Sequence, residues 1–150
     1  MEKWREITDD LRGRVLAARS MAVWPIDENP LSESFQAARF FQDLGWRIYP
    51  VHDRCERILD ENCYRDIRLI PDDYDILLLF TYPEQLPEVV NAIFNADFVP
   101  SIVWAHTGIF DQQSFDRLTN AGIIAIMDSD LKEVYRGFME ERPQTEVQGE

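Results

Sequence analysis

The chain has 150 residues, of which 45% are hydrophobic and 12% aromatic, and this content is enough for one domain with a substantial core. Its formal net charge is −13, from 28 acidic and 15 basic residues, so neither nucleic acid nor an anionic membrane is expected as a partner. Because no apolar run is long enough to cross a membrane and no signal-peptide core follows Met1, we expect a cytoplasmic protein.

The first predicted element is an amphipathic helix over residues 1–17. Trp4, Ile7, Leu11 and Val15 recur at spacings of three and four, which places them on one side of a helix. We expect this side to pack on the main domain, which is predicted to span residues 18–138.

Five short apolar runs follow the helix. Their hydrophobicity is continuous rather than alternating, which is typical of strands buried on both faces of a parallel sheet. The predicted strands lie at residues 21–24, 47–51, 75–80, 99–104 and 123–127.

Helical patterns separate these strands, at residues 35–45, 87–95 and 111–122, and a last helix follows at 131–138. Ser34 is the expected cap of the first of them, and Gly45 and Gly122 are expected to end helices. The alternation predicts a doubly wound α/β fold with a five-stranded parallel sheet. The polar segment 139–150 is expected to be disordered.

Ligands of such sheets bind beyond the carboxyl ends of the strands. Polar residues follow every predicted strand at this edge, although the same residue types also simply end strands and cap helices. The candidates are Pro25, Ile26, Asp27, His52, Asp53, Arg54, Thr81, Tyr82, His106, Thr107, Gly108, Asp128, Ser129 and Asp130.

Catalytic motifs are missing from this edge. No HxH or HxxxH spacing supports a metal site, and no GxSxG elbow accompanies Ser129. Cys55 and Cys63 form no CxxC pair, so two reduced thiols are expected. Asp53 lies where a dinucleotide-binding domain places its ribose-binding acid, but no glycine occurs between Gly13 and Gly45, so the phosphate-binding fingerprint is absent. We therefore expect a protein that is not an enzyme.

Several segments resemble, in order and spacing, the small stand-alone CoA-binding proteins, which are Rossmann-like domains related to the CoA-binding domain of succinyl-CoA synthetase alpha subunits. The segments are AVWPIDENPLSESF (22–35), FQDLGWRIYPV (41–51), CY (63–64), FTYPE (80–84), VWAHTG (103–108) and MD (127–128). The resemblance covers residues 18–138.

The resemblance implies a non-catalytic protein that binds CoA or an acyl-CoA. It implies that the phosphates lie at the first turn and at the helix start near Ser34, with adenine near the residues after the second and third strands. The cofactor-binding residues that it implies are Pro25, Ile26, Asp27, Ser34, His52, Asp53, Arg54, Thr81, Tyr82, His106, Thr107, Gly108 and Asp128.

The chain departs from the family pattern at the contact positions. Family members usually carry glycine, a small residue and serine where this chain has Pro25, Ile26 and Asp27, and an arginine where it has Thr81. Acids near the phosphates predict weak CoA binding. The alternative is a diverged paralogue that has lost CoA and binds another small ligand, or a protein partner through its acidic surface.

Overall fold

The computed structural model describes the backbone of residues 2–148 and the side chains of residues 9–140. The chain forms two compact units. Residues 19–130 form one unit, and the helices α1 (Glu2–Ala17) and α5 (Leu131–Gln148) form the other. Across the described helices, none is both long enough and apolar enough to span a membrane.

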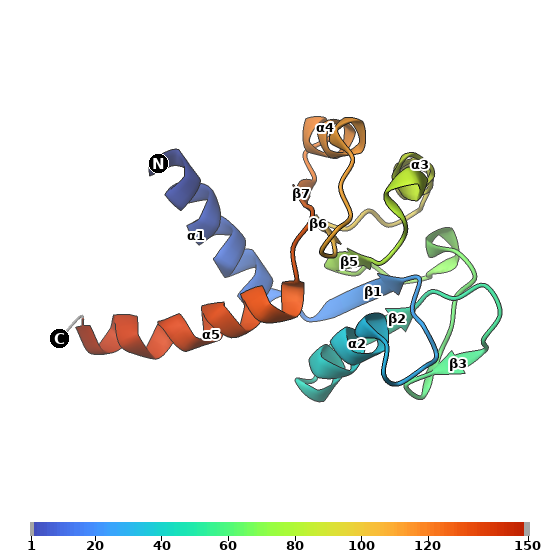
Figure 1. Ribbon diagram of the computed structural model, residues 1–150, viewed down its shortest axis with the longest axis horizontal. Helices are drawn as coiled ribbons and strands as arrows, with labels where there is room; N and C mark the ends of the chain where they lie inside the picture. Colours follow the sequence, from blue (N-terminus) through green and yellow to red (C-terminus); the bar gives the residue numbers. More distant parts are fainter. Residues whose placement is uncertain (1, 149–150) are drawn as a thin grey trace. The chain divides into compact units, whose positions relative to one another are not determined.

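A five-stranded parallel sheet organises the larger unit (Figure 1). Its strands are β1 (Ser20–Trp24), β2 (Arg47–Pro50), β5 (Ile76–Leu79), β6 (Ile102–Ala105) and β7 (Ile124–Ile126). The order is β2-β1-β5-β6-β7, so the winding direction reverses between β1 and β5. This confirms the predicted doubly wound α/β fold, which is Rossmann-like, and it places the switch point between those two strands.

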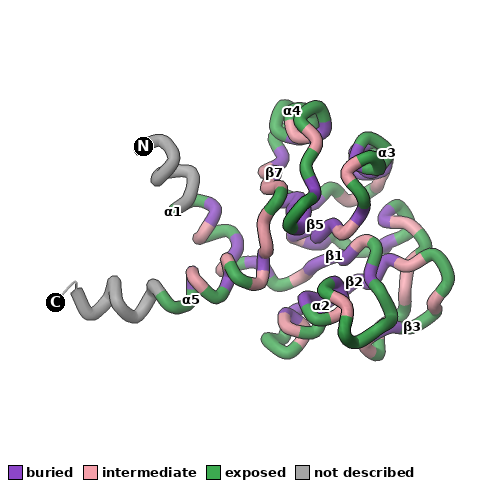
Figure 2. The backbone as a smooth tube through the Cα atoms, viewed as in Figure 1, coloured by how far each residue is buried: buried purple, intermediate pink, exposed green. Residues whose placement is uncertain are grey.

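Helices cover both faces of the sheet. In Figure 1, α3 (Leu86–Phe94) and α4 (Gln112–Asn120) lie on one side and α2 (Glu33–Asp43) on the other. Figure 2 shows the strands as the most continuously buried part of the unit. The continuous apolar runs of the sequence are explained by this two-sided burial, because neither face of a central strand meets water.

The connection between β2 and β5 contains structure that the sequence pattern did not predict. A small hairpin joins β3 (Arg57–Ile58) to β4 (Glu61–Asn62), and a 3-10 turn, η1, follows at Ile67–Leu69. The hairpin turn places Leu59 and Asp60 at positive φ. An Asn-Gly pair would have indicated this turn, and Leu-Asp does not.

Two sequence-based expectations about helix ends need correction. Ser32, not Ser34, caps α2, because its hydroxyl accepts the backbone N–H of Phe35 at 3.2 Å. The last helix continues to Gln148, ten residues beyond the predicted end, since most of the added residues are good helix formers. The expected packing of α1 on the main domain stays a prediction, and the side chains of Trp4 and Ile7 lie outside the described residues.

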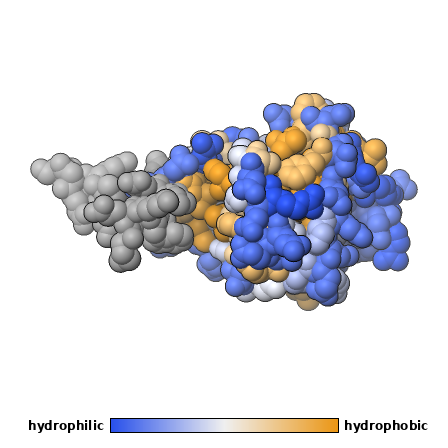
Figure 3. Space-filling view, turned by 90° about the horizontal axis from the view of Figure 1, so that it is seen from above, coloured by the Kyte–Doolittle hydropathy of each residue, from blue (hydrophilic) through white to orange (hydrophobic). Residues whose placement is uncertain are grey.

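Hydrophilic residues dominate the face seen in Figure 3, and hydrophobic residues gather in smaller patches between them. Both cysteines are free thiols.

Candidate ligand-binding groove

A groove of about 880 Å³ lies at the switch point, within the larger unit. It is bounded by the turn after β1, the first turn of α2, the end of β2, the η1 segment, the end of β5 and one face of α3. Its volume is in the range of small-molecule and cofactor sites. A cavity therefore lies beyond the carboxyl ends of the strands, where ligands of such sheets bind.

The turn after β1 is held by hydrogen bonds from both flanks. The N–H of Ile26 donates to the carbonyl of Val51 at 3.0 Å, and the N–H of Asp27 donates to the hydroxyl of Ser34 at 2.8 Å. Asp27 Oδ1 in turn accepts the N–H of Asn29 at 2.9 Å. Pro25 has no N–H, so this turn offers a ligand fewer donors than a glycine-rich turn would.

The start of α2 is a donor surface in the groove. Ser32, Glu33 and Ser34 all line the cavity. Ser32 occupies the N–H of Phe35, while no hydrogen bond within the described part of the chain occupies the N–H groups of Glu33 and Ser34. Unpaired amides at a helix start suit an anionic group, and the helix dipole adds to this preference.

Thr81 is a second unsatisfied polar group of the same cavity. Its residue is 5% exposed, and its Oγ1 has no hydrogen-bond partner among the described residues. Because a buried hydroxyl without a partner costs about 1–3 kcal/mol, such groups are rare unless a ligand or water satisfies them.

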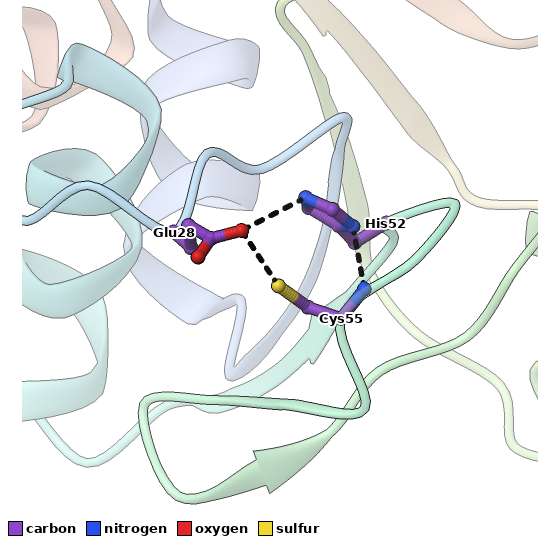
Figure 4. Close-up of side chains that lie close together, drawn as sticks. All are labelled: Glu28, His52 and Cys55. Carbon is purple, nitrogen blue, oxygen red and sulfur yellow. Dashed lines mark hydrogen bonds and ion pairs between the residues drawn. The ribbon is translucent and has the colours of Figure 1, made fainter.

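Glu28, His52 and Cys55 form a cluster beside the groove (Figure 4). Glu28 Oε1 accepts the Cys55 thiol at 2.9 Å and lies 4.0 Å from His52 Nε2. His52 Nδ1 accepts two backbone N–H groups, from Arg54 and Cys55, each at 2.9 Å. These three residues come from two loops that follow adjacent strands, so their pairing depends on the sheet.

The histidine geometry bears on metal binding. The potential ligand atoms of Glu28, His52 and Cys55 lie within 4.8 Å of one another. A metal-bound imidazole, however, usually donates its second ring N–H to an acceptor, and here that nitrogen already accepts two donors. The neutral ring must then carry its proton on Nε2, the atom that faces Glu28. That neither His52 nor His106 binds a metal stays a prediction.

Replacing Glu28 by Gln is expected to accelerate alkylation of Cys55. The hydrogen bond to the Glu28 carboxylate, followed by burial, raises the pKa of the Cys55 thiol above its usual value. Only the thiolate reacts, so removing this carboxylate should increase the iodoacetamide rate at pH 8 several-fold. The measurement uses a Cys63→Ser background, although burial already raises the pKa of Cys63 to about 11. An unchanged rate in Glu28→Gln, relative to a Glu56→Gln control, would contradict the observed pairing.

Arginines of the groove are already engaged in protein contacts. Arg65 Nη1 donates to the carbonyls of His52 at 3.0 Å and Cys55 at 2.6 Å. Arg68 makes a two-point contact with Asp66 at 2.9 and 2.8 Å, and this hydrogen bonding lowers the pKa of the Asp66 carboxyl. Sequence reasoning missed both arginines, because they lie in the irregular segment before β5, where no periodic pattern indicates which residues turn inward.

Eight of the thirteen predicted site residues line the groove, namely Pro25, Ile26, Asp27, Ser34, His52, Asp53, Arg54 and Thr81. The other five, Tyr82, His106, Thr107, Gly108 and Asp128, do not.

Two contacts account for several of the residues outside the groove. Asp128 Oδ1 accepts the N–H of Gly108 at 2.7 Å, so the two stabilise the loop after β6. His106 Nε2 lies 3.4 Å from Glu33 Oε2, and its ring packs on Phe80 with centroids 4.6 Å apart. Since Glu33 and Phe80 both line the cavity, His106 adjoins it without reaching it.

The parallel sheet, its switch point and the groove there define a Rossmann-like α/β domain. A family model described as "CoA binding domain" matches residues 19–134, and the chain belongs to that family.

Among curated proteins, the uncharacterized protein YneT of Bacillus subtilis (strain 168) is 26% identical over 115 residues, which cover 77% of this chain and 84% of YneT. Two solved structures have the same fold. A hypothetical protein from Pyrococcus horikoshii OT3 has a TM-score of 0.80 at 20% identity, over 88% of this chain and 92% of its own. A Thermus thermophilus protein, cell-free ID.343, has a TM-score of 0.76 at 24% identity, over 87% and 98%.

Proposed function

We propose that this chain is a non-catalytic binding protein that holds CoA or an acyl-CoA in the groove. The observation that carries the proposal is that two hydrogen-bond donor groups without partners line the same cavity. The first is the start of α2 with the amides of Glu33 and Ser34, and the second is the buried hydroxyl of Thr81. A diphosphate group has acceptor oxygens for both, and membership of the CoA binding domain family supports the same ligand.

The proposal places the ligand's diphosphate at the α2 end and its adenosine toward the end of β2. Backbone N–H groups bind an anion whatever the neighbouring side chains are, so this contact survives the substitutions at Pro25 and Asp27. The ligand's other polar groups then face the side chains along η1 and α3.

The contacts of Cys55 and His52 bear on the non-catalytic part of the proposal. Cys55 donates its proton to Glu28, and His52 uses Nδ1 to accept backbone amides. The hydrogen bond to the Glu28 carboxylate raises the pKa of the Cys55 thiol and so lowers its thiolate fraction, while His52 presents an N–H rather than a lone pair to Glu28.

A second candidate function is favoured by the charge of the groove. Six carboxylates line it against three arginines, two of which are engaged as described above. The carboxylates belong to Asp27, Glu28, Glu33, Asp53, Asp66 and Glu88. This balance favours a diverged paralogue that has lost CoA and binds another, less anionic small ligand, or binds a protein partner through its own acidic surface.

Native mass spectrometry of the freshly purified protein and calorimetric titration with CoA test the proposal. We expect a co-purifying mass or a measurable Kd, and we expect Thr81→Val to weaken CoA binding by about threefold to tenfold, because the buried hydroxyl loses its ligand bond. Thr107→Val, an exposed threonine outside the groove, is the matched control. Absence of any binding at millimolar CoA would exclude the function, and equal losses in both variants would exclude the Thr81 contact.

A further inference from the structure

Glu28 lies at the end of the groove next to the loop after β2, which we call the β2 end. Contacts with that loop orient its carboxylate. Its Oε1 is occupied by the Cys55 thiol and approached by His52 Nε2, whereas its second oxygen points away from both in Figure 4. The side chain is 66% exposed, so the second oxygen remains accessible to a ligand. Glu28 lines the cavity, so its carboxylate is a hydrogen-bond acceptor available to a ligand there.

Asp53 adds a second carboxylate at the same end of the groove. It directly follows His52, lines the cavity, and its Oδ1 lies 3.5 Å from His52 Nδ1 and 3.8 Å from Arg54 Nε. In doubly wound sheets, an acid at the end of the second strand accepts hydrogen bonds from ribose hydroxyls. Two acids therefore stand where a nucleotide's ribose is expected when its diphosphate lies at the helix start.

The bases in this region do little to offset these acids. Arg65 is engaged with two carbonyls and Arg68 with Asp66. Arg54 Nε lies 3.8 Å from Asp53 Oδ1, but both side chains are 86% exposed, so water screens this ion pair. A phosphate on the ribose would meet two like charges, whereas a free hydroxyl would donate to them.

Acidic groups alone do not define a ligand site, but Thr81 provides independent support. Thr81 lines the same cavity, its buried hydroxyl has no partner among the described residues, and it follows β5, which pairs with β1 on the side away from β2. We infer that the β2 end of the groove selects an adenine nucleotide whose ribose hydroxyls are both free. The inference rests on the proposed function and specifies which form of the ligand the site prefers.

Among the ligands with this chemistry, 3′-dephospho-CoA and NAD⁺ each have a counterpart that differs only by a phosphate on the ribose. Calorimetric titrations therefore compare two pairs, dephospho-CoA with CoA and NAD⁺ with NADP⁺, in which only the ribose phosphate differs. We expect dephospho-CoA to bind at least about tenfold more tightly than CoA, which corresponds to about 1.4 kcal/mol. The tighter of dephospho-CoA and NAD⁺ identifies the source of the nucleotide.

Glu28→Gln is expected to reduce the dephospho-CoA preference below about threefold, because the amide keeps the shape and loses the charge. Asp53→Asn is expected to reduce it as well. Glu56→Gln removes one exposed acid of the same loop outside the groove and should leave the ratio unchanged.

The titrations distinguish failure of the ribose preference from failure of CoA binding itself. Tighter binding of CoA than of dephospho-CoA, or an unchanged ratio in Glu28→Gln, overturns the inference and leaves the CoA site standing. Binding of dephospho-CoA without binding of CoA supports the inference and overturns the proposed function. No binding of any of the four nucleotides overturns both.

Discussion

Pro25→Gly combined with Asp27→Ser is expected to raise the affinity for CoA by roughly thirtyfold to a thousandfold. Glycine adds a backbone N–H to the turn, and serine removes one negative charge from beside the phosphates, changes worth together on the order of 2–4 kcal/mol. The turn should survive, because the Asp27 N–H that donates to Ser34 is a backbone group, and serine can replace Asp27 Oδ1 as the acceptor of the Asn29 N–H. Calorimetric titration of both proteins measures the difference.

The affinity for CoA should also change with salt concentration in a direction that tests this prediction. Repulsion between Asp27 and the phosphates is screened by moderate salt, so CoA binding by the natural chain should tighten as salt rises, whereas a site dominated by Arg and Lys would weaken. Asp43→Ser, at the exposed far end of α2, changes the net charge equally and should not affect binding. Tight CoA binding by the natural chain, or no gain in the double variant, would show that Pro25 and Asp27 do not control the site.

Trp104→Ala is expected to lower the free energy of unfolding by about 3–5 kcal/mol. Trp104 is 1% exposed in β6, between Leu78 of β5 and Ile126 of β7, and its Nε1 donates to the carbonyl of Ser129 at 2.9 Å. The substitution creates a cavity and leaves that carbonyl without its donor. Urea unfolding followed by circular dichroism measures the change.

Phe110→Ala is the matched control for this loss of stability. Phe110 is an aromatic side chain in the loop after β6 and is 49% exposed, so its removal should cost less than about 1 kcal/mol. Similar losses for the two variants would argue against Trp104 as a core residue.

Much of the fold could be predicted because its signals are local. Each buried strand is a continuous apolar run, and Gly45 and Gly122 adopt the positive φ that their places after helices predicted. The cap of α2 was assigned wrongly because two serines compete for the role. The hydroxyl of Ser34 accepts the N–H of Asp27 instead, and this contact depends on the path of the preceding turn.

The interior of the groove was harder to predict because its contacts join distant parts of the sequence. Glu28 meets Cys55 across 27 residues, and Arg65 reaches back to the carbonyl of His52 through a hairpin whose turn lacks a sequence signature. The carboxyl-edge rule selected the loops after β1, β2 and β5, which line the groove, and also the loops after β6 and β7, which do not. No periodicity shows which side chains of an irregular loop face a cavity.

The pairing of β1 with β5 also determines when the groove can form during synthesis. Met21 pairs with Ile76, so the two walls are brought together only by closing a loop of more than fifty residues. Such non-local pairing is slow, and a nascent chain that has not yet emerged past Thr81 has the start of α2 but not the opposite wall. We therefore expect a ribosome-bound chain to acquire ligand-dependent protection from proteolysis only after α3 has left the exit tunnel. By then the turn after β1 has long been synthesised.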